Sequence, residues 1–212
     1  MTKLRLLSLL VFTSIFCTSV TAQVNYYSGF DTPEEREGWV EYKTAATTFS
    51  HWEYSTVDPY SPENCVGHDY SPSTGITLTD NWYVSPVFYV TAGGTLDSLR
   101  YAFSGFSVPT SEDTIGVYLL RNNQDPELAS SKELLFDFRG DDYITDGVYR
   151  QLTDIDLPAS TQPCYLALRY KNSDCSSYWL SVRFDNIAIT HSPTASIDLP
   201  EPDRPNFFIY PN

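Results

Sequence analysis

Short runs in which apolar and polar residues alternate dominate the second half of the chain. Alternation with a period of two is typical of a strand with one buried face, because successive side chains of a strand point to opposite sides. Pro, Gly, Asn and Asp interrupt the runs at regular intervals, as turns between strands require. The pattern predicts about ten strands in two stacked antiparallel sheets, an all-β sandwich. The predicted buried faces of the four clearest runs are Leu99, Tyr101 and Phe103; Ile115, Val117 and Leu119; Leu134, Phe136 and Phe138; and Leu166, Leu168 and Tyr170.

In the last run before the C-terminal region, two sets of apolar residues are out of phase with each other. A β-bulge adds one residue to a strand and reverses the facing of every residue after it. We therefore expect a bulge at Asp185 and Asn186, which keeps both sets on the buried face. The two sets are Leu180, Val182 and Phe184, followed by Ile187 and Ile189.

Two short helical turns are predicted as well. Thr32 can cap a turn that opens on Pro33 and continues with acidic residues, the usual signature of a helix N-terminus. The Asp-Pro-Glu segment 125–127 predicts a second turn, which could extend to Leu134.

Residues 1–22 have the organisation of a secretory signal peptide. Lys3 and Arg5 form a basic start, 6–17 is apolar, and 20–22 is a cleavage site of small residues. The alternative is a membrane anchor, but the apolar run falls short of the ~20 residues that span a bilayer. We expect cleavage, export from the cytoplasm and no transmembrane segment in the mature chain.

The rest of the chain divides by composition into three parts. The strand pattern covers 23–190 and predicts one domain. Residues 191–206 are rich in proline and polar residues, which is typical of a linker. Residues 207–212 form a short β-like segment.

The composition narrows the classes of function. Aromatic residues make up 15% of the chain, and β-branched and aromatic residues favour strands. The net charge is −14 at pH 7. This charge excludes phosphate-backbone binding as the default, since nucleic-acid binding needs a basic surface.

The chain has four cysteines, of which Cys17 leaves with the signal peptide. An odd number in an oxidising compartment means one disulfide and one free thiol, or no disulfide. Cys164 opens a predicted strand and Cys175 follows it, which separates them by ~25 Å and prevents a bond. Of the remaining pairings we favour Cys65 with Cys175. No cysteine or histidine spacing indicates zinc.

Three segments carry a combined signal: the strand DNWYVSP at 80–86, the closing strand pair at 165–187, and the entry GFD at 29–31 with GW at 38–39. Together they resemble the cleaved-adhesin, or choice-of-anchor J, domains of secreted bacterial proteins. The family includes the haemagglutinin/adhesin domains released from gingipain-type protease precursors. The resemblance spans about 24–190 and implies a jelly-roll β-sandwich with a role in adhesion. It also supports the pairing of Cys65 with Cys175.

The resemblance further implies a structural calcium ion where the first and last strands meet. Asp31 and Asp185 would be the side-chain ligands, with backbone carbonyls completing the six to eight oxygens that Ca²⁺ takes. The alternative is that both aspartates only cap turns. The region 41–48 lacks the metal-loop spacing of many relatives. The C-terminal 208–212 resembles the start of a type IX secretion sorting domain that is cut short.

A group of aromatic residues precedes the strand at 80–86 and is the predicted ligand-binding face. Aromatic platforms with polar partners bind carbohydrates, and exposed aromatics are common binding hot spots. The alternative is that these residues pack in the core, as most aromatics in sandwiches do. The candidates are Trp52, Tyr54, Tyr60, His68 and Tyr70, with His51 beside them.

Other motifs give weaker indications. Arg139-Gly140-Asp141 is the integrin-recognition tripeptide at a predicted turn, although so short a motif arises often by chance. The sequence has no HExxH, GxSxG or P-loop pattern. We expect a protein without catalytic activity.

The predicted function is that of a secreted module, free or attached to the outer-membrane surface, that binds a host protein or glycan through loops at one end of the sandwich. One alternative is a carbohydrate-binding module of a secreted hydrolase, or the hydrolase itself. Another is a structural subunit of a surface assembly, which would join partner chains through exposed strand edges.

Overall fold

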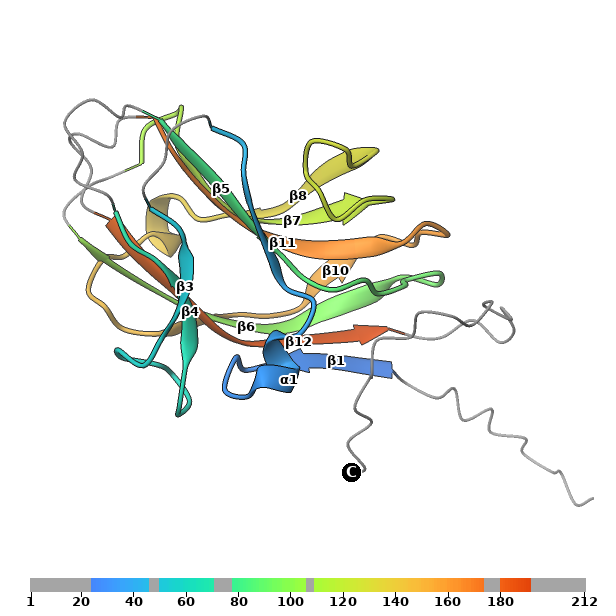
Figure 1. Ribbon diagram of the computed structural model, residues 1–212, viewed down its shortest axis with the longest axis horizontal. Coiled ribbons are helices and arrows are strands. Elements are labelled where there is room, and N and C mark those ends of the chain that lie inside the picture. Colours follow the sequence, from blue (N-terminus) through green and yellow to red (C-terminus); the bar gives the residue numbers. More distant parts are fainter. Residues whose placement is uncertain (1–23, 46–49, 71–77, 106–108, 174–179, 192–212) are drawn as a thin grey trace, which may run out of the picture.

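The computed structural model describes residues 24–45, 50–70, 78–105, 109–173 and 180–191. Two antiparallel sheets lie face to face and enclose the core (Figure 1). The predicted fold class, a jelly-roll β-sandwich of two antiparallel sheets, is confirmed. In the described part of the chain, no helix is long and apolar enough to cross a membrane.

The first sheet has seven strands. Five follow the order β10-β6-β12-β4-β3, while β1 also pairs with β12 and β9 also pairs with β6. The long strands β6 and β12 form its centre (Figure 1). The bounds are β1 Val24–Ser28, β3 Trp52–Ser55, β4 Cys65–His68, β6 Gly94–Gly105, β9 Arg150–Leu152, β10 Ile155–Leu157 and β12 Leu180–His191.

The second sheet has five strands in the order β2-β5-β11-β7-β8. Two short helices lie outside the sheets: α1 (Pro33–Arg36) follows β1, and the 3₁₀ turn η1 (Gly140–Asp142) follows β8. The bounds of the strands are β2 Val40–Lys43, β5 Thr79–Val84, β7 Thr114–Arg121, β8 Ser131–Asp137 and β11 Cys164–Asn172.

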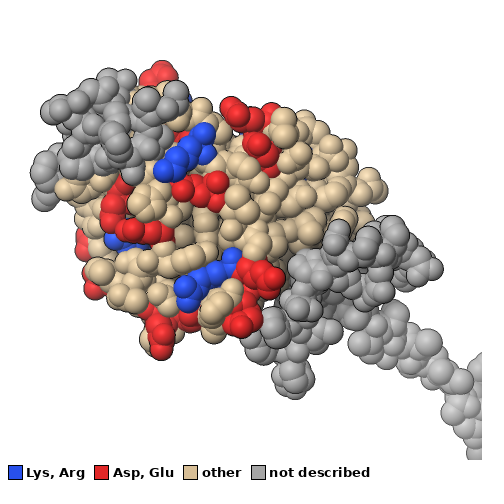
Figure 2. All heavy atoms as spheres, viewed as in Figure 1, with Lys and Arg blue, Asp and Glu red and all other residues tan. Residues whose placement is uncertain are grey.

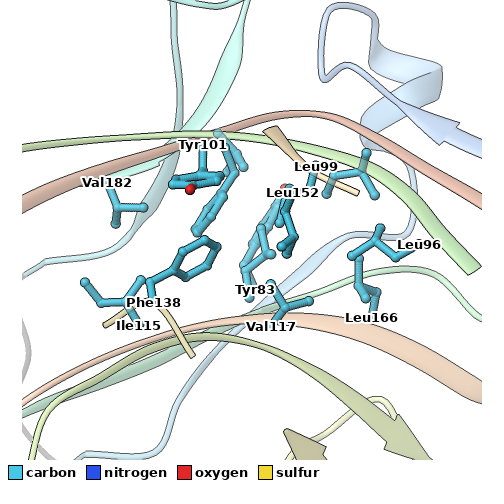
Figure 3. Close-up of a cluster of buried hydrophobic side chains, with 14 of the residues drawn as sticks. Tyr83, Leu96, Leu99, Tyr101, Ile115, Val117, Phe138, Leu152, Leu166 and Val182 are labelled. Carbon is cyan, nitrogen blue, oxygen red and sulfur yellow. The ribbon is translucent and has the colours of Figure 1, made fainter. Parts of the chain in front are cut away.

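The core lies between the sheets and is built from the predicted alternating faces (Figure 3). Leu99 and Tyr101 of β6 face Val117 of β7 and Leu166 of β11 across it. Three of the four predicted buried faces are confirmed in full, because every member is at most 5% exposed. Aromatic rings fill much of this space, with Phe138 at 4.6 Å from Tyr101 between ring centroids.

The predicted bulge in the last strand is also confirmed. The register of β12 against β6 shifts between Asp185 and Ala188, and Asn186 takes a positive φ of 48°. Both apolar sets of this strand are therefore buried, as expected. The bulge also turns Asp185 and Asn186 toward the outer side of the sheet, where they meet the connection between β3 and β4.

The helix predictions have mixed outcomes. Thr32 caps α1 by accepting a hydrogen bond from the backbone N–H of Glu35, as predicted. The second predicted turn is present at 125–129, but its extension to Leu134 is wrong, because the chain is already extended in β8 from Ser131. The Asp125 carbonyl accepts from the N–H of Ala129, and the pairing of β8 with β7 begins at Ser131.

The predicted buried face of β8 needs a correction as well. Phe138 is buried, but Leu134 is exposed and Phe136 only partly buried. The register against β7 shifts between Val117 and Tyr118, so a bulge turns Leu134 to the outer face. Strict alternation could not show this because the bulge breaks it.

The first and last described strands lie side by side. Strand β1 pairs along the second half of β12, with Val24 opposite His191. Strand β12 thus continues one residue into the region predicted as a linker. The predicted signal peptide, the rest of the linker and the 207–212 segment lie outside the described residues.

Candidate functional site

The outer face of the seven-stranded sheet carries exposed tyrosines beside an arginine. We call this set the tyrosine patch. Figure 1 shows the β3–β4 connection, which carries Tyr60, beyond the β6–β12 layer on the side away from the second sheet. The members of the patch are Tyr27, Tyr60, Arg100 and Tyr149, of which Tyr27 and Tyr60 are exposed.

Tyr60 is the centre of the tyrosine patch. The guanidinium carbon of Arg100 lies 4.3 Å from the centroid of its ring, which is a cation–π contact. The ring of Tyr149 lies 5.6 Å away at an angle of 60°. Tyr60 is 46% exposed, so much of its ring remains open to a ligand.

Arg100 reaches the outer face through the alternation of β6. Its neighbours Leu99 and Tyr101 are buried in the core, so the side chain between them points outward. Gln151 lies opposite on β9, and Asp185 lies opposite on β12. Three adjacent strands therefore form the floor beneath Tyr60.

A buried carboxylate fastens the β3–β4 connection to this floor. Asp185 Oδ2 accepts hydrogen bonds from the backbone N–H groups of Tyr60 at 2.9 Å and Ser61 at 3.0 Å. Its Oδ1 accepts from the N–H of Asn186 at 2.7 Å. Burial raises the pKa of Asp185 to about 6, although these N–H groups act in the opposite direction. The backbone at Tyr60 is thereby held rigidly against the sheet.

A second set of contacts holds the same connection at its edges. The Asn186 amide oxygen accepts from the hydroxyl groups of Tyr27 and Ser61. Asp31 Oδ1 accepts from the backbone N–H of Asn64 at 2.8 Å. The tyrosine patch is therefore positioned by side chains from β1 and β12 as well as by its own loop.

The structure places the two predicted calcium ligands against the same β3–β4 connection. Asp31 accepts from the N–H of Asn64. Asp185 accepts from those of Tyr60 and Ser61. Burial is the main cause of the raised pKa of Asp185, and the charge of Asp31 adds to it. The described residues hold no group of three or more His, Cys, Asp and Glu side chains suited to a metal. The pair would fit a calcium ion only with backbone carbonyls or water as further ligands. The calcium site stays a prediction.

The structure separates the predicted aromatic face into buried and exposed members. Trp52 packs against Phe184, and His68 stacks on Tyr170 with ring centroids 4.0 Å apart. Both are buried, so the assignment of Trp52 and His68 as ligand contacts is corrected: they are core residues.

The other predicted aromatic residues lie nearer the surface. Tyr54 is exposed at its edge but shares a hydrogen bond with the buried Tyr83 and lies under Arg36. Tyr70 is partly buried. Tyr60 alone of the predicted set belongs to the tyrosine patch.

The cysteines and the tripeptide do not join this site. Cys65 and Cys164 are buried and are not bonded to each other, and burial raises the pKa of each. Cys175 lies outside the described residues, so its pairing with Cys65 stays a prediction. Arg139 of the tripeptide donates to the Asp113 carbonyl at 2.6 Å and pairs with Asp137.

Comparisons with protein-family models and with curated proteins find no match. Comparison with solved structures gives a K1 cleaved adhesin domain of Lys-gingipain from Porphyromonas gingivalis W83, at 19% identity and a TM-score of 0.53. The match covers 80% of this chain and 99% of that domain. This chain has the fold of a cleaved adhesin domain.

Two further solved structures resemble this chain. The K3 cleaved adhesin domain of the same Lys-gingipain is 18% identical, with a TM-score of 0.48 over 78% of this chain and 98% of that one. The CBM22-1 xylan-binding domain of Paenibacillus barcinonensis Xyn10C is 10% identical, with a TM-score of 0.44 over 81% and 95%.

Within this cleaved-adhesin fold, sequence reasoning missed Tyr27, Arg100 and Tyr149. A signal for Arg100 was present, because alternation places it on the face opposite Leu99 and Tyr101. No local pattern marks Tyr27 and Tyr149, since strand pairing alone brings them beside Asn186 and Tyr60.

Proposed function

We propose that this protein is a non-catalytic binding module that acts outside the cell, secreted or attached to the outer-membrane surface. It holds a host protein or a glycan against the tyrosine patch. The observation that carries the proposal is that Tyr60, 46% exposed, sits on a connection that the buried Asp185 fixes to the sheet.

Rigid, exposed aromatic rings are well suited to binding. Tyrosine offers a large contact surface and loses little conformational freedom on binding, because it has two side-chain torsions. Here the backbone is already fixed, and Arg100 holds the ring of Tyr60 from below. Ordering the site on binding therefore costs little free energy.

The site lies on a sheet face and the connection above it. The fold comparison supports a binding role at the level of architecture, since the similar K1 structure is an adhesin domain by its name. The export signal predicted at 1–22 supports an extracellular location.

The test is a binding screen followed by titration of variants. The purified protein is screened against a glycan array and a panel of extracellular-matrix proteins, and the best-bound probe is titrated. We expect Tyr60→Ala to weaken binding by about tenfold or more, because it removes the central ring. Leu134→Ala is the matched control, since Leu134 is 47% exposed but lies on the other sheet. Equal binding by wild type and Tyr60→Ala would refute the proposal.

A further inference from the structure

Arg100 forms no ion pair among the described residues, although the chain carries 27 acidic residues and 13 basic ones. Its side chain has the Tyr60 ring as its contact and is in none of the ion pairs found there. Asp185 lies opposite Arg100 on β12, but its carboxylate accepts hydrogen bonds from backbone N–H groups. The Lys and Arg residues that do form ion pairs in the described ranges are Lys43, Arg121, Arg139, Arg150, Arg169 and Arg183.

The guanidinium of Arg100 is nevertheless held in place. The guanidinium carbon lies 4.3 Å from the Tyr60 ring centroid, and a cation–π contact uses none of the five N–H donors. Those donors lie at the edge of the guanidinium plane, where a carboxylate can accept two of them at once. The arrangement is a pre-oriented anion contact beside an exposed aromatic ring.

We infer that Tyr60 and Arg100 bind a sugar that carries a carboxylate, such as a uronic or sialic acid unit of a glycan. The inference rests on the proposed function and names the ligand class of the same site. The apolar face of the sugar ring packs on the exposed surface of Tyr60, and the sugar carboxylate accepts hydrogen bonds from Arg100.

Polar groups at the edge of the tyrosine patch suit the hydroxyl groups of a sugar. Tyr27, Ser61 and Asn186 form one hydrogen-bonded chain directly beside Tyr60. Hydroxyl and amide groups of this kind can both donate and accept. A sugar ring over Tyr60 would therefore meet aromatic, cationic and neutral polar groups at once.

The surroundings favour an acidic sugar over an extended peptide. At the patch, β6 is paired with β12 on one side and with β9 on the other, and β12 is paired with β4 or β1 on its far side. The two central strands β6 and β12 are therefore paired beneath Tyr60, and within the described residues a peptide could add a strand only at the outer edges of β9 or β1, to the sides of the Tyr60 ring.

The charges favour a single carboxylate over a phosphate or a polyanion. Arg150 and Arg183, on neighbouring strands, are neutralised by Asp146 and Asp69. Figure 2 shows acidic side chains spread over one face of the molecule with few basic ones among them. With a net charge of −14, the protein repels polyanions at long range, so the Arg100 guanidinium selects its ligand by direct contact. Arg36, which is also in none of the ion pairs of the described residues, donates to the carbonyls of Asp31 and Thr32.

Matched pairs of probes test the inference by isothermal titration. They are sialyllactose against lactose, and the hyaluronan disaccharide and methyl galacturonoside, which carry one carboxylate each, against their carboxyl-reduced forms. We expect at least one acidic probe to bind about tenfold or more tightly than its neutral partner, as a charged hydrogen bond implies. Arg100→Gln should abolish that preference, and Tyr60→Ala should weaken binding of both partners.

Lys132→Gln is the control for net charge, since Lys132 is exposed on β8 of the other sheet. Melting curves verify that each variant is folded. Equal affinity for acidic and neutral partners, or a preference that survives Arg100→Gln, would overturn the inference while leaving the binding role intact. Binding of proteins but of no saccharide would overturn it too. If Tyr60→Ala changes binding of no saccharide and no protein, the proposed function itself fails.

Discussion

The outer faces of the two sheets both place an arginine on an aromatic ring, yet the two pairs have opposite surroundings. On the five-stranded sheet, the Arg169 guanidinium lies 4.5 Å from the Trp82 ring, and its Nε and Nη2 donate to Asp80 at 2.8 and 2.7 Å. Trp82 is only 3% exposed. On the seven-stranded sheet, Arg100 lies on the exposed Tyr60 and is in no ion pair among the described residues.

This difference distinguishes the Arg169–Asp80 pair, which stabilises the fold, from Arg100 and Tyr60, which are open to a ligand. Arg169 and Asp80 satisfy each other and cover a second apolar cluster that includes Trp82 and Tyr118. Gln124 closes the same face by donating to the carbonyls of Gly38 and Ser85. An arginine with its own carboxylate has little left to offer a ligand, whereas Arg100 keeps its donors.

The largest effect expected from this comparison concerns stability. Asp80→Ala leaves the Arg169 charge largely buried and unpaired, so we expect a loss of about 3 kcal/mol in the free energy of unfolding. Arg100→Ala should lose no more than about 1 kcal/mol, the size of an exposed cation–π contact. Urea unfolding measures both changes. Equal losses would show that Arg100 is as structural as Arg169.

The sequence alone sufficed for much of the fold because one face of most strands is buried. Alternation placed Leu99 and Tyr101 in the core, and the phase change located the bulge at Asp185. The outward orientation of Leu134 was not predicted, because the bulge in β8 opposite β7 lies in a segment whose sequence alternates regularly.

The candidate site depended on information that local sequence does not hold. Trp52 and His68 are opposite each other on neighbouring strands and both point to the core, which only the register reveals. The lack of an ion pair at Arg100 likewise depends on the residues beside it in space. Gln151 is neutral, and the Asp185 carboxylate accepts hydrogen bonds from backbone N–H groups instead. Both neighbours come from distant parts of the chain.

A fall in pH should lower the free energy of unfolding through His68 in the core between the sheets. It should not act through Arg100 or Arg169, because both arginines stay charged. Burial lowers the pKa of His68 to about 3, so the unfolded chain takes up this proton first as the pH falls below 6.5. The protein should therefore lose about 2 kcal/mol through His68 between pH 7 and pH 5. Urea unfolding of wild type and His68→Gln at both pH values checks this. A variant with the same pH dependence as wild type would contradict it.

The smallest expected effect tests whether a bound cation helps to hold the tyrosine patch in place. If calcium binds Asp31 and Asp185, it stabilises the tyrosine patch and leaves the outer face of the five-stranded sheet unchanged. At a concentration ten times its dissociation constant, a bound ion adds about 1.4 kcal/mol, which raises the melting midpoint by roughly 3–6 °C. Melting in EDTA and in millimolar Ca²⁺ measures the shift, which Asp31→Asn should remove and Asp80→Asn should not. An unchanged midpoint would mean that N–H groups alone, those of Tyr60, Ser61 and Asn186, hold the Asp185 carboxylate. The rigidity of the tyrosine patch would then come from the bulge in β12 and not from a metal ion.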